Sequence, residues 1–455
     1  MKEQPQYLLA GFLMPHPPLL IESIGADRLD EVAKTTAACN SVAESIANLA
    51  PDVIVYVTPH SIVYTDYFHI SPGLGARGSF AAFGAPAKNA VAHYDEAFVD
   101  SLISLLEERN IYGGTLGEKD NSLDHGVMVP MHFINRKVAN YKAVRISQSG
   151  MNSYEHYRLG QAIAHTANTL EVKTVILASG DLSHKLTEDG PYGFAKEGPE
   201  FDQKIVDILK SGNFLELFTL DPEMCEKSAE CGLRSLVVMA GALDGLSVRC
   251  EFLSYEGPFG VGYAVSGFYA EDSDEQRFFL EQVEDAEDIY VKLARITLEG
   301  VVRTGEVPKI TMDLPEEMLE TQAGVFVSIK KGRELRGCIG TIAPTRNNIA
   351  LEIMQNAISA GFSDTRFKEI NAAELPLLSY SVDILHPPEA IDDINMLDVE
   401  EYGCIVSSGE RRGLLLPNLD GISTVEEQVE IAKSKAGILP GEEVKLERFR
   451  VIRHT

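Results

Sequence analysis

Hydrophobic residues follow two alternating patterns along the first half of the chain. Short continuous apolar runs such as YLLAGFLM are typical of buried strands, whereas apolar residues three or four apart are typical of helices. These patterns predict strands at residues 7–14, 52–58, 142–147 and 173–179 and helices at residues 26–49 and 153–170. Residues 200–245 are predicted to be helical, and residues 246–255 and 261–270 to form two closing strands. Because strands alternate with helices, we expect an α/β domain with an at least partly parallel sheet.

The pattern changes after the charged stretch EDSDEQ (271–276), which we interpret as a linker. A helix is predicted from Gln276 to Arg303, then a hairpin at residues 323–341 and a strand at the start of LSYSVDILHPP (378–388). A helix followed by separated strands predicts a second, smaller α+β domain. The predicted domains are residues 1–271 and 276–455, and a chain of 455 residues has room for both.

Composition excludes several classes of function. A formal charge of −28 argues against a general nucleic-acid binder, because phosphate binding needs a basic surface. The first residues lack the apolar core of a signal peptide, and no run of about 18 apolar residues predicts a membrane span. The six cysteines show neither zinc-finger nor CxxC spacing, so we expect free thiols in a reducing, cytoplasmic setting.

Histidines follow three of the predicted strands. His16 lies in PHPP after the first strand, His60 follows the second, and His184 follows the strand at 173–179. Ligands of open α/β sheets bind outside the carboxyl ends of strands, so we expect the three imidazoles to share one crevice. His125 is a further candidate, because Asp124 beside it can orient the ring and Gly126 allows a substrate to approach closely.

A pair of imidazoles suggests a metal centre. Two neutral histidines and one carboxylate form the facial triad that holds Fe(II) and leaves positions open for substrate and O2. We predict that Glu230 joins His16 and His60, although a carboxylate at a helix start is also favoured by the helix dipole alone. Cys231 next to it is an alternative, softer ligand, and Glu256 is a third choice.

The motifs around these histidines resemble a known family. PHPP with His16, TPH with His60, LDHGVMVPMHF with His125 and SGDLSH with His184 resemble the class III extradiol ring-cleavage dioxygenases, the LigB-like superfamily, over about residues 5–270. The resemblance implies a LigB-like mixed sheet flanked by helices, and non-haem Fe(II) bound by His16, His60 and a glutamate. It also implies that His184 is a catalytic acid/base, that His125 lines the site, and that a small catechol-like aromatic molecule and O2 are the substrates.

The same superfamily leaves an alternative open. In the similar Memo-like proteins, which share the fold without an established dioxygenase role, the last residue of the metal site is a cysteine followed by glycine. Glu230-Cys231-Gly232 matches both options. The Memo-like alternative implies a metal-binding or scaffold protein without dioxygenase activity, and zinc is the alternative metal.

The second half resembles the AMMECR-type domain, through LRGCIGT (335–341), SDTRF (363–367) and RRGLLLP (411–417). The two-domain order resembles the AmmeMemoRadiSam system proteins, which implies a radical-SAM protein as partner, and related folds often form homodimers. We expect Arg336 and Cys338 to form an anion or thiol site, with a structural cysteine in a hairpin as the simpler alternative. Metal is predicted in the first domain alone.

Overall fold

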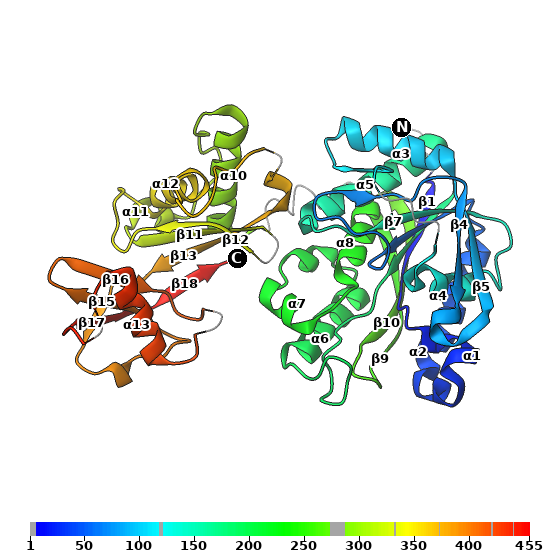
Figure 1. Cartoon of the computed structure of the whole chain (residues 1–455). Helices are drawn as coiled ribbons and strands as arrows, with labels where there is room; N and C mark the ends of the chain where they lie inside the picture. Colours follow the sequence, from blue (N-terminus) through cyan, green and yellow to red (C-terminus); the bar gives the residue numbers. More distant parts are fainter. Residues whose placement is uncertain are drawn as a thin grey trace. The chain divides into compact units, whose positions relative to one another are not determined.

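The computed structural model describes residues 6–117, 122–273, 287–331, 334–372, 374–419, 422–439 and 441–455. The chain divides into two compact units, residues 1–286 and 287–455 (Figure 1). The second half of the predicted linker, residues 274–276, and the predicted helix as far as residue 286 lie outside the described residues.

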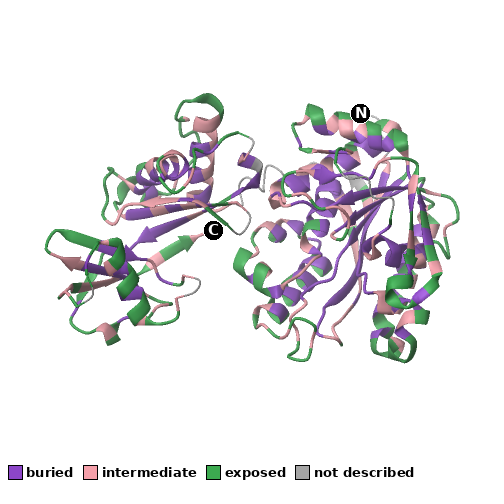
Figure 2. Cartoon of the chain, in the orientation of Figure 1, coloured by how far each residue is buried: buried purple, intermediate pink, exposed green. Residues whose placement is uncertain are grey.

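A six-stranded mixed sheet forms the centre of the first unit. Its order is β7 (Lys142–Ser147), β2 (Val53–Thr58), β8 (Thr174–Ser179), β1 (Leu8–Met14), β10 (Tyr263–Ser273) and β9 (Leu246–Glu256). The first four strands are parallel, whereas β10 runs antiparallel to β1 and β9 antiparallel to β10. Continuous apolar runs form the parallel strands, which are buried as the sequence predicts (Figure 2).

Helices cover both faces of this sheet (Figure 1). On one face, Phe12, Tyr56 and Leu177 share a core with α2 (Ala33–Leu49) and α4 (His125–Ile134). On the other face lie α5 (Ser153–Leu170) and α8 (Leu233–Ala242), with Met239 of α8 against Gly11. Among the described residues, the other α-helices and strands of this unit are α1 (Glu22–Gly25), α3 (Glu96–Glu108), α6 (Glu197–Ser211), α7 (Pro222–Ser228), β3 (Phe68–His69), β4 (Gly75–Phe80), β5 (Ala85–His93) and β6 (Gly113–Gly114). The helix predicted at 26–49 begins as a 3-10 helix, Ala26–Val32.

Two antiparallel four-stranded sheets form the second unit. One has the order β12 (Glu334–Gly340), β11 (Gly324–Lys331), β13 (Leu378–Leu385) and β18 (Val451–His454). The other has the order β14 (Glu389–Ile391), β17 (Lys445–Phe449), β15 (Gly403–Ser408) and β16 (Arg411–Leu415). The helices are α10 (Ile289–Thr304), α11 (Glu316–Glu320), α12 (Ile349–Phe362) and α13 (Val425–Lys435). The unit is α+β, and the hairpin predicted at residues 323–341 is β11–β12.

Within the described ranges, none of the helices combines the length and the apolar character that crossing a bilayer requires.

Each unit should fold without the other, because each has its own apolar clusters. We expect fragments 1–286 and 287–455, expressed separately, to unfold in single cooperative transitions with midpoints close to those of the full chain. Thermal unfolding followed by circular dichroism measures this. A fragment that lacks a cooperative transition would show that its core needs the other unit.

Candidate metal centre

Three neighbouring parallel strands place polar side chains at one edge of the sheet. His16, His60 and Asp181 each stand two residues beyond the end of a strand, namely β1, β2 and β8. These strands are adjacent in the sheet, in the order β2, β8, β1, so their carboxyl ends lie side by side. The strand-end pattern therefore brings the two histidines together.

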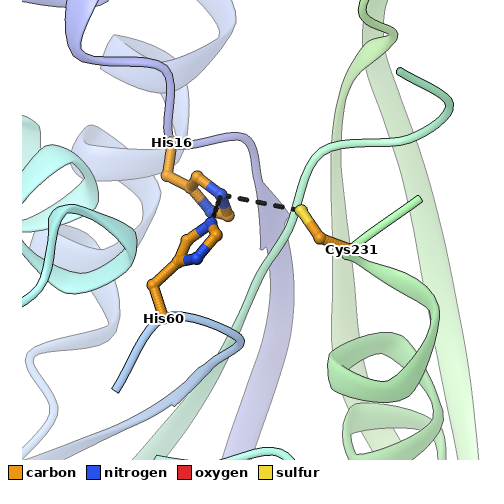
Figure 3. Close-up of side chains that lie close together, drawn as sticks. All are labelled: His16, His60 and Cys231. Carbon is orange, nitrogen blue, oxygen red and sulfur yellow. Dashed lines mark hydrogen bonds between the residues drawn. The ribbon is translucent and has the colours of Figure 1, made fainter. Parts of the chain in front are cut away.

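The donor atoms of His16, His60 and Cys231 converge (Figure 3). The two Nε2 atoms are 3.0 Å apart, and the Cys231 sulfur is 3.7 Å from Nε2 of His16. A tetrahedral metal with bonds of about 2.0–2.3 Å separates its ligand atoms by roughly 3.3–3.7 Å. All three atoms lie within 4.8 Å of one another, which is close enough for one metal ion to contact all of them.

Hydrogen bonds fix the tautomer of His16. The Ser179 hydroxyl donates its one proton to the Gly126 carbonyl at 2.5 Å, so it accepts the bond from Nδ1 of His16 at 2.9 Å. The proton of the neutral ring is thus on Nδ1, and the lone pair of Nε2 faces His60 and Cys231. Burial lowers the pKa of His16 to about 3, against the opposing effect of Asp181, so the ring stays neutral and ready to bind a metal.

Glu230 and Cys231, the two adjacent candidates for the third ligand, have different neighbours. The Glu230 carboxylate accepts a 2.7 Å bond from the backbone N–H of Leu233 and so caps the first turn of α8. Among the described residues, neither group of convergent donor atoms includes Glu230, whereas both include Cys231. Glu256 accepts bonds from the amide and hydroxyl of Thr35 and also belongs to neither group.

Close contact between two loops carries Cys231 to the histidines. A Cβ atom on Gly180 would lie 2.1 Å from the Cα atom of Gly232, so the two backbones can touch only where side chains are missing. The Asp181 amide donates to the Cys231 sulfur at 3.2 Å, and the Cys231 amide donates to the Asp181 carbonyl at 3.3 Å. Gln148, just beyond β7, donates to the Cys231 carbonyl at 2.9 Å.

Asp181 and His184 form an acid–base pair beside the sulfur. Together with Cys231 they make a second group of convergent donor atoms, and Oδ2 of Asp181 is 3.9 Å from Nε2 of His184. Nδ1 of His184 donates to the Ala229 carbonyl at 2.5 Å, so the lone pair of the neutral ring is on Nε2. Burial opposes the charged ring, but Asp181, the Ala229 carbonyl and Glu230 outweigh it and raise the pKa of His184.

His125 begins α4 and lies against both histidines. Its ring stacks on His60 with 4.2 Å between centroids and stands edge-on to His16 at 5.2 Å. Asp124 caps the helix by accepting a bond from Val127, and its other bond, from the Thr58 hydroxyl, ties it to the end of β2. Burial lowers the pKa of His125 in spite of Asp124, so the ring is neutral.

Two exposed aromatic rings border this cluster. The ring centroid of Phe83 lies 5.6 Å from that of His125, and Tyr192 stacks on His184 with 5.2 Å between the ring centroids.

The second unit keeps Arg336 and Cys338 in different surroundings. The Arg336 guanidinium donates to both carboxylate oxygens of Glu374, at 2.8 and 3.0 Å. The Cys338 sulfur instead accepts a bond from the hydroxyl of Ser328, across the hairpin. Arg336 is therefore engaged by a carboxylate of its own domain.

Comparisons with known proteins agree with this architecture. The model for the catalytic LigB subunit of aromatic ring-opening dioxygenase matches residues 10–266, and the AMMECR1 model matches residues 291–454. This chain belongs to the LigB family. Its LigB domain is fused to an AMMECR1 domain, as the sequence motifs indicate.

One of the relatives matches this chain along nearly its whole length. A protein of Clostridium acetobutylicum is 40% identical over 98% of this chain and 99% of its own length. A protein of Thermotoga maritima is 48% identical over 36% of this chain and 96% of its own length. A crystal structure of an uncharacterized protein from Pyrococcus horikoshii covers 36% of this chain and 88% of its own, with 30% identity and a TM-score of 0.34.

The residues of the LigB domain fit a metal ion. Two imidazoles and a thiol are borderline and soft donors of the kind that iron, copper and zinc accept. The serine that fixes the His16 ring supplies the outer hydrogen bond that metal-binding histidines usually make. Sequence reasoning did not single out Asp181, although it stands at the same distance beyond its strand as His16 and His60. Nor did it find Ser179 or Gln148, whose contacts depend on the folded sheet.

Asp124 should contribute more to stability than an ordinary helix cap. Replacing it by alanine removes a cap, worth about 1 kcal/mol, and the bond from Thr58, worth about 1 kcal/mol more. It also removes the carboxylate that lies 3.6 Å from the buried guanidinium of Arg145, which adds to the loss. Asp95 caps α3 by the same kind of bond, so Asp95→Ala is the matched control, with an expected loss of about 1 kcal/mol. Urea unfolding of the two variants measures the difference, and equal losses would contradict it.

Proposed function

We propose that the LigB domain is a metal-dependent oxidoreductase of the extradiol type. In this proposal His16, His60 and Cys231 hold one Fe(II) ion, and the substrates are a small catechol-like molecule and O2. The observation that carries it is the convergence of three donor atoms next to the Asp181–His184 pair. Family membership supports the same reaction class.

Each residue has a role set by its surroundings. Bound Fe(II) supplies Lewis acidity, electrons for O2 and open coordination positions. His184 holds and moves a proton at Nε2, because its Nδ1 is committed to the Ala229 carbonyl. Asp181 stabilises the protonated ring of His184. His125, a neutral ring, donates a hydrogen bond to a substrate oxygen.

Aromatic surfaces support a planar substrate. Phe83 and Tyr192 are exposed and lie against His125 and His184, the two histidines assigned to the substrate. Offset or edge-on packing against such rings favours an aromatic molecule.

A second candidate function rests on Cys231. The facial triad that activates O2 at Fe(II) has a carboxylate as its third ligand, whereas a thiol converges here. This favours the Memo-like alternative, in which the domain binds a metal such as zinc, works with a radical-SAM partner and has no dioxygenase activity.

Element analysis and oxygen uptake separate these candidates. Full-length protein purified without oxygen should contain one equivalent of iron and consume O2 with a catechol, giving a coloured ring-opened product. One tightly held equivalent of zinc, or iron without O2 uptake across a panel of catechols, supports the second candidate instead.

Metal affinity should depend on Cys231 rather than on Glu230. Loss of an outer-sphere partner costs about 10–100-fold in affinity, so loss of a ligand in Cys231→Ser should cost at least as much. Glu230→Gln keeps an oxygen for the cap and should retain the metal. Competition with a chromophoric chelator measures both, and the reverse ranking would assign the carboxylate as the ligand.

His184→Ala should keep the metal and lose turnover. General acid–base catalysis contributes about 10²–10⁴-fold, so we expect a fall of that size in kcat for any catechol on which activity is found. His165→Ala, on the exposed side of α5, is the control that should change neither property. Metal loss in His184→Ala would show that this ring is a ligand.

A further inference from the structure

Asp202 is a buried carboxylate that the proposed reaction does not use. It lies on α6 and is 1% exposed. The carboxylates of α6 that form ion pairs, in the described part of the chain, are instead Glu197 and Glu200. Burying a carboxylate without a cation is costly unless other donors satisfy its oxygens, so the hydrogen bonds of Asp202 indicate its role.

Two hydrogen bonds satisfy this carboxylate. The Ser183 amide donates to Oδ1 at 2.7 Å, and the hydroxyl of Tyr255 on β9 donates to Oδ2 at 2.7 Å. Burial raises the pKa of Asp202 to about 7, and the two bonds oppose that change. The carboxylate therefore joins α6 and β9 to the residue that precedes His184.

Two glycines allow the close contact between α6 and this loop. A Cβ atom on Gly262 would lie 2.0 Å from Oδ2 of Asp202, and a Cβ atom on Gly198 would lie 2.7 Å from the hydroxyl oxygen of Ser183. Gly198 and Asp202 are four residues apart on α6, so they lie on the same face of the helix. That face lies against the loop that carries His184.

The same loop is bound on another side by the end of α7. The Ser183 hydroxyl and the His184 amide both donate to the Ser228 carbonyl at 3.0 Å. Nδ1 of His184 donates to the Ala229 carbonyl at 2.5 Å. Because α6 binds the amide of the preceding residue, a displacement of Ser183 would move the ring relative to both Ala229 and Asp181.

We propose that Asp202 is a positioning residue for His184. By binding the Ser183 amide, it holds the ring where Nδ1 meets the Ala229 carbonyl and Nε2 lies 3.9 Å from Oδ2 of Asp181. The catalytic consequence rests on the proposed function, in which His184 moves a proton at Nε2. The positioning itself is a property of the folded chain and is measured without a substrate.

Nitrogen NMR tests this on the metal-free full-length protein with isotope-labelled histidines. The ring signals of His184, assigned by their absence in His184→Gln, report which nitrogen carries the proton when the ring is neutral. We expect the proton on Nδ1 in the wild type. In Asp202→Ala the loop loses its anchor, so both tautomers should be populated and the two nitrogen signals should move toward each other.

Three controls make the effect specific. Asp202→Asn retains an oxygen for the Ser183 amide and should keep the wild-type signals. Asp207→Ala removes a carboxylate from the exposed side of the same helix and should also leave them unchanged. His16, whose Nδ1 is bound to Ser179, should keep its tautomer in every variant, which separates a local effect from general loosening.

Tyr255→Phe is a second test if Asp202→Ala does not fold. It removes the bond to Oδ2 and leaves the carboxylate in place, so the His184 signals should move in the same direction by a smaller amount. Unchanged His184 signals in Asp202→Ala, or in Tyr255→Phe where Asp202→Ala does not fold, would overturn the proposal. Equal changes at His16 and His184 would overturn it as well.

Turnover gives a separate measurement. With any catechol on which activity is found, Asp202→Ala should lose about 10²-fold in kcat with little change in KM, because a misplaced proton-transfer group affects the chemical step. Altered His184 signals without turnover by the wild type on any catechol would support the positioning role and reject the proposed function.

Discussion

The parallel pairing of β1, β8 and β2 is the constraint on which the metal centre depends. Met14 pairs with Ser179, and Val57 pairs with Ala178, so the three strands end nearly level. A slip of one residue in either pairing would shift a strand end by about 3.3 Å. It would also turn each side chain of that strand to the other face. The approach of the His16 and His60 nitrogens therefore follows from backbone register, before any metal contributes.

The Asp181 carboxylate lies close to two histidines whose pKa values shift in opposite directions. Oδ2 of Asp181 is 3.9 Å from Nε2 of His16 and 3.9 Å from Nε2 of His184. His16 is almost fully buried, and the cost of burying a charge dominates, so its pKa falls. His184 is more exposed and also donates a hydrogen bond to the Ala229 carbonyl, so its pKa rises. Burial, rather than distance to the carboxylate, keeps the His16 ring neutral, whereas the less buried His184 ring takes up a proton more readily.

In the AMMECR1 domain, the residues of LRGCIGT have separate roles. Arg336 lies where the pairing of β11 with β12 shifts, and it binds Glu374. A Cβ atom on Gly337 would lie 2.2 Å from the Ala360 carbonyl oxygen, so this glycine allows β12 to pack against α12. Cys338 faces the other side, toward Ser328. The motif thus combines packing on one face of the sheet with an accessible thiol on the other.

Local sequence determined the elements and the edge of the sheet at which the histidines gather. Apolar runs that stop at Pro15 and Pro59 predict both the strand ends and the positions of His16 and His60, because proline cannot continue a strand ladder. Only the tertiary structure shows that Cys231, rather than Glu230, lies beside the two histidines. The two are neighbours in the chain, and either has the chemistry of a ligand. The start of α8 draws the carboxylate to its free N–H groups, while the Gly180–Gly232 contact directs the thiol toward His16. The cap is local, since Glu230 and Leu233 are three residues apart. The Gly180–Gly232 contact needs a loop from elsewhere in the sheet, and for this reason the residues around Cys231 did not contain the answer.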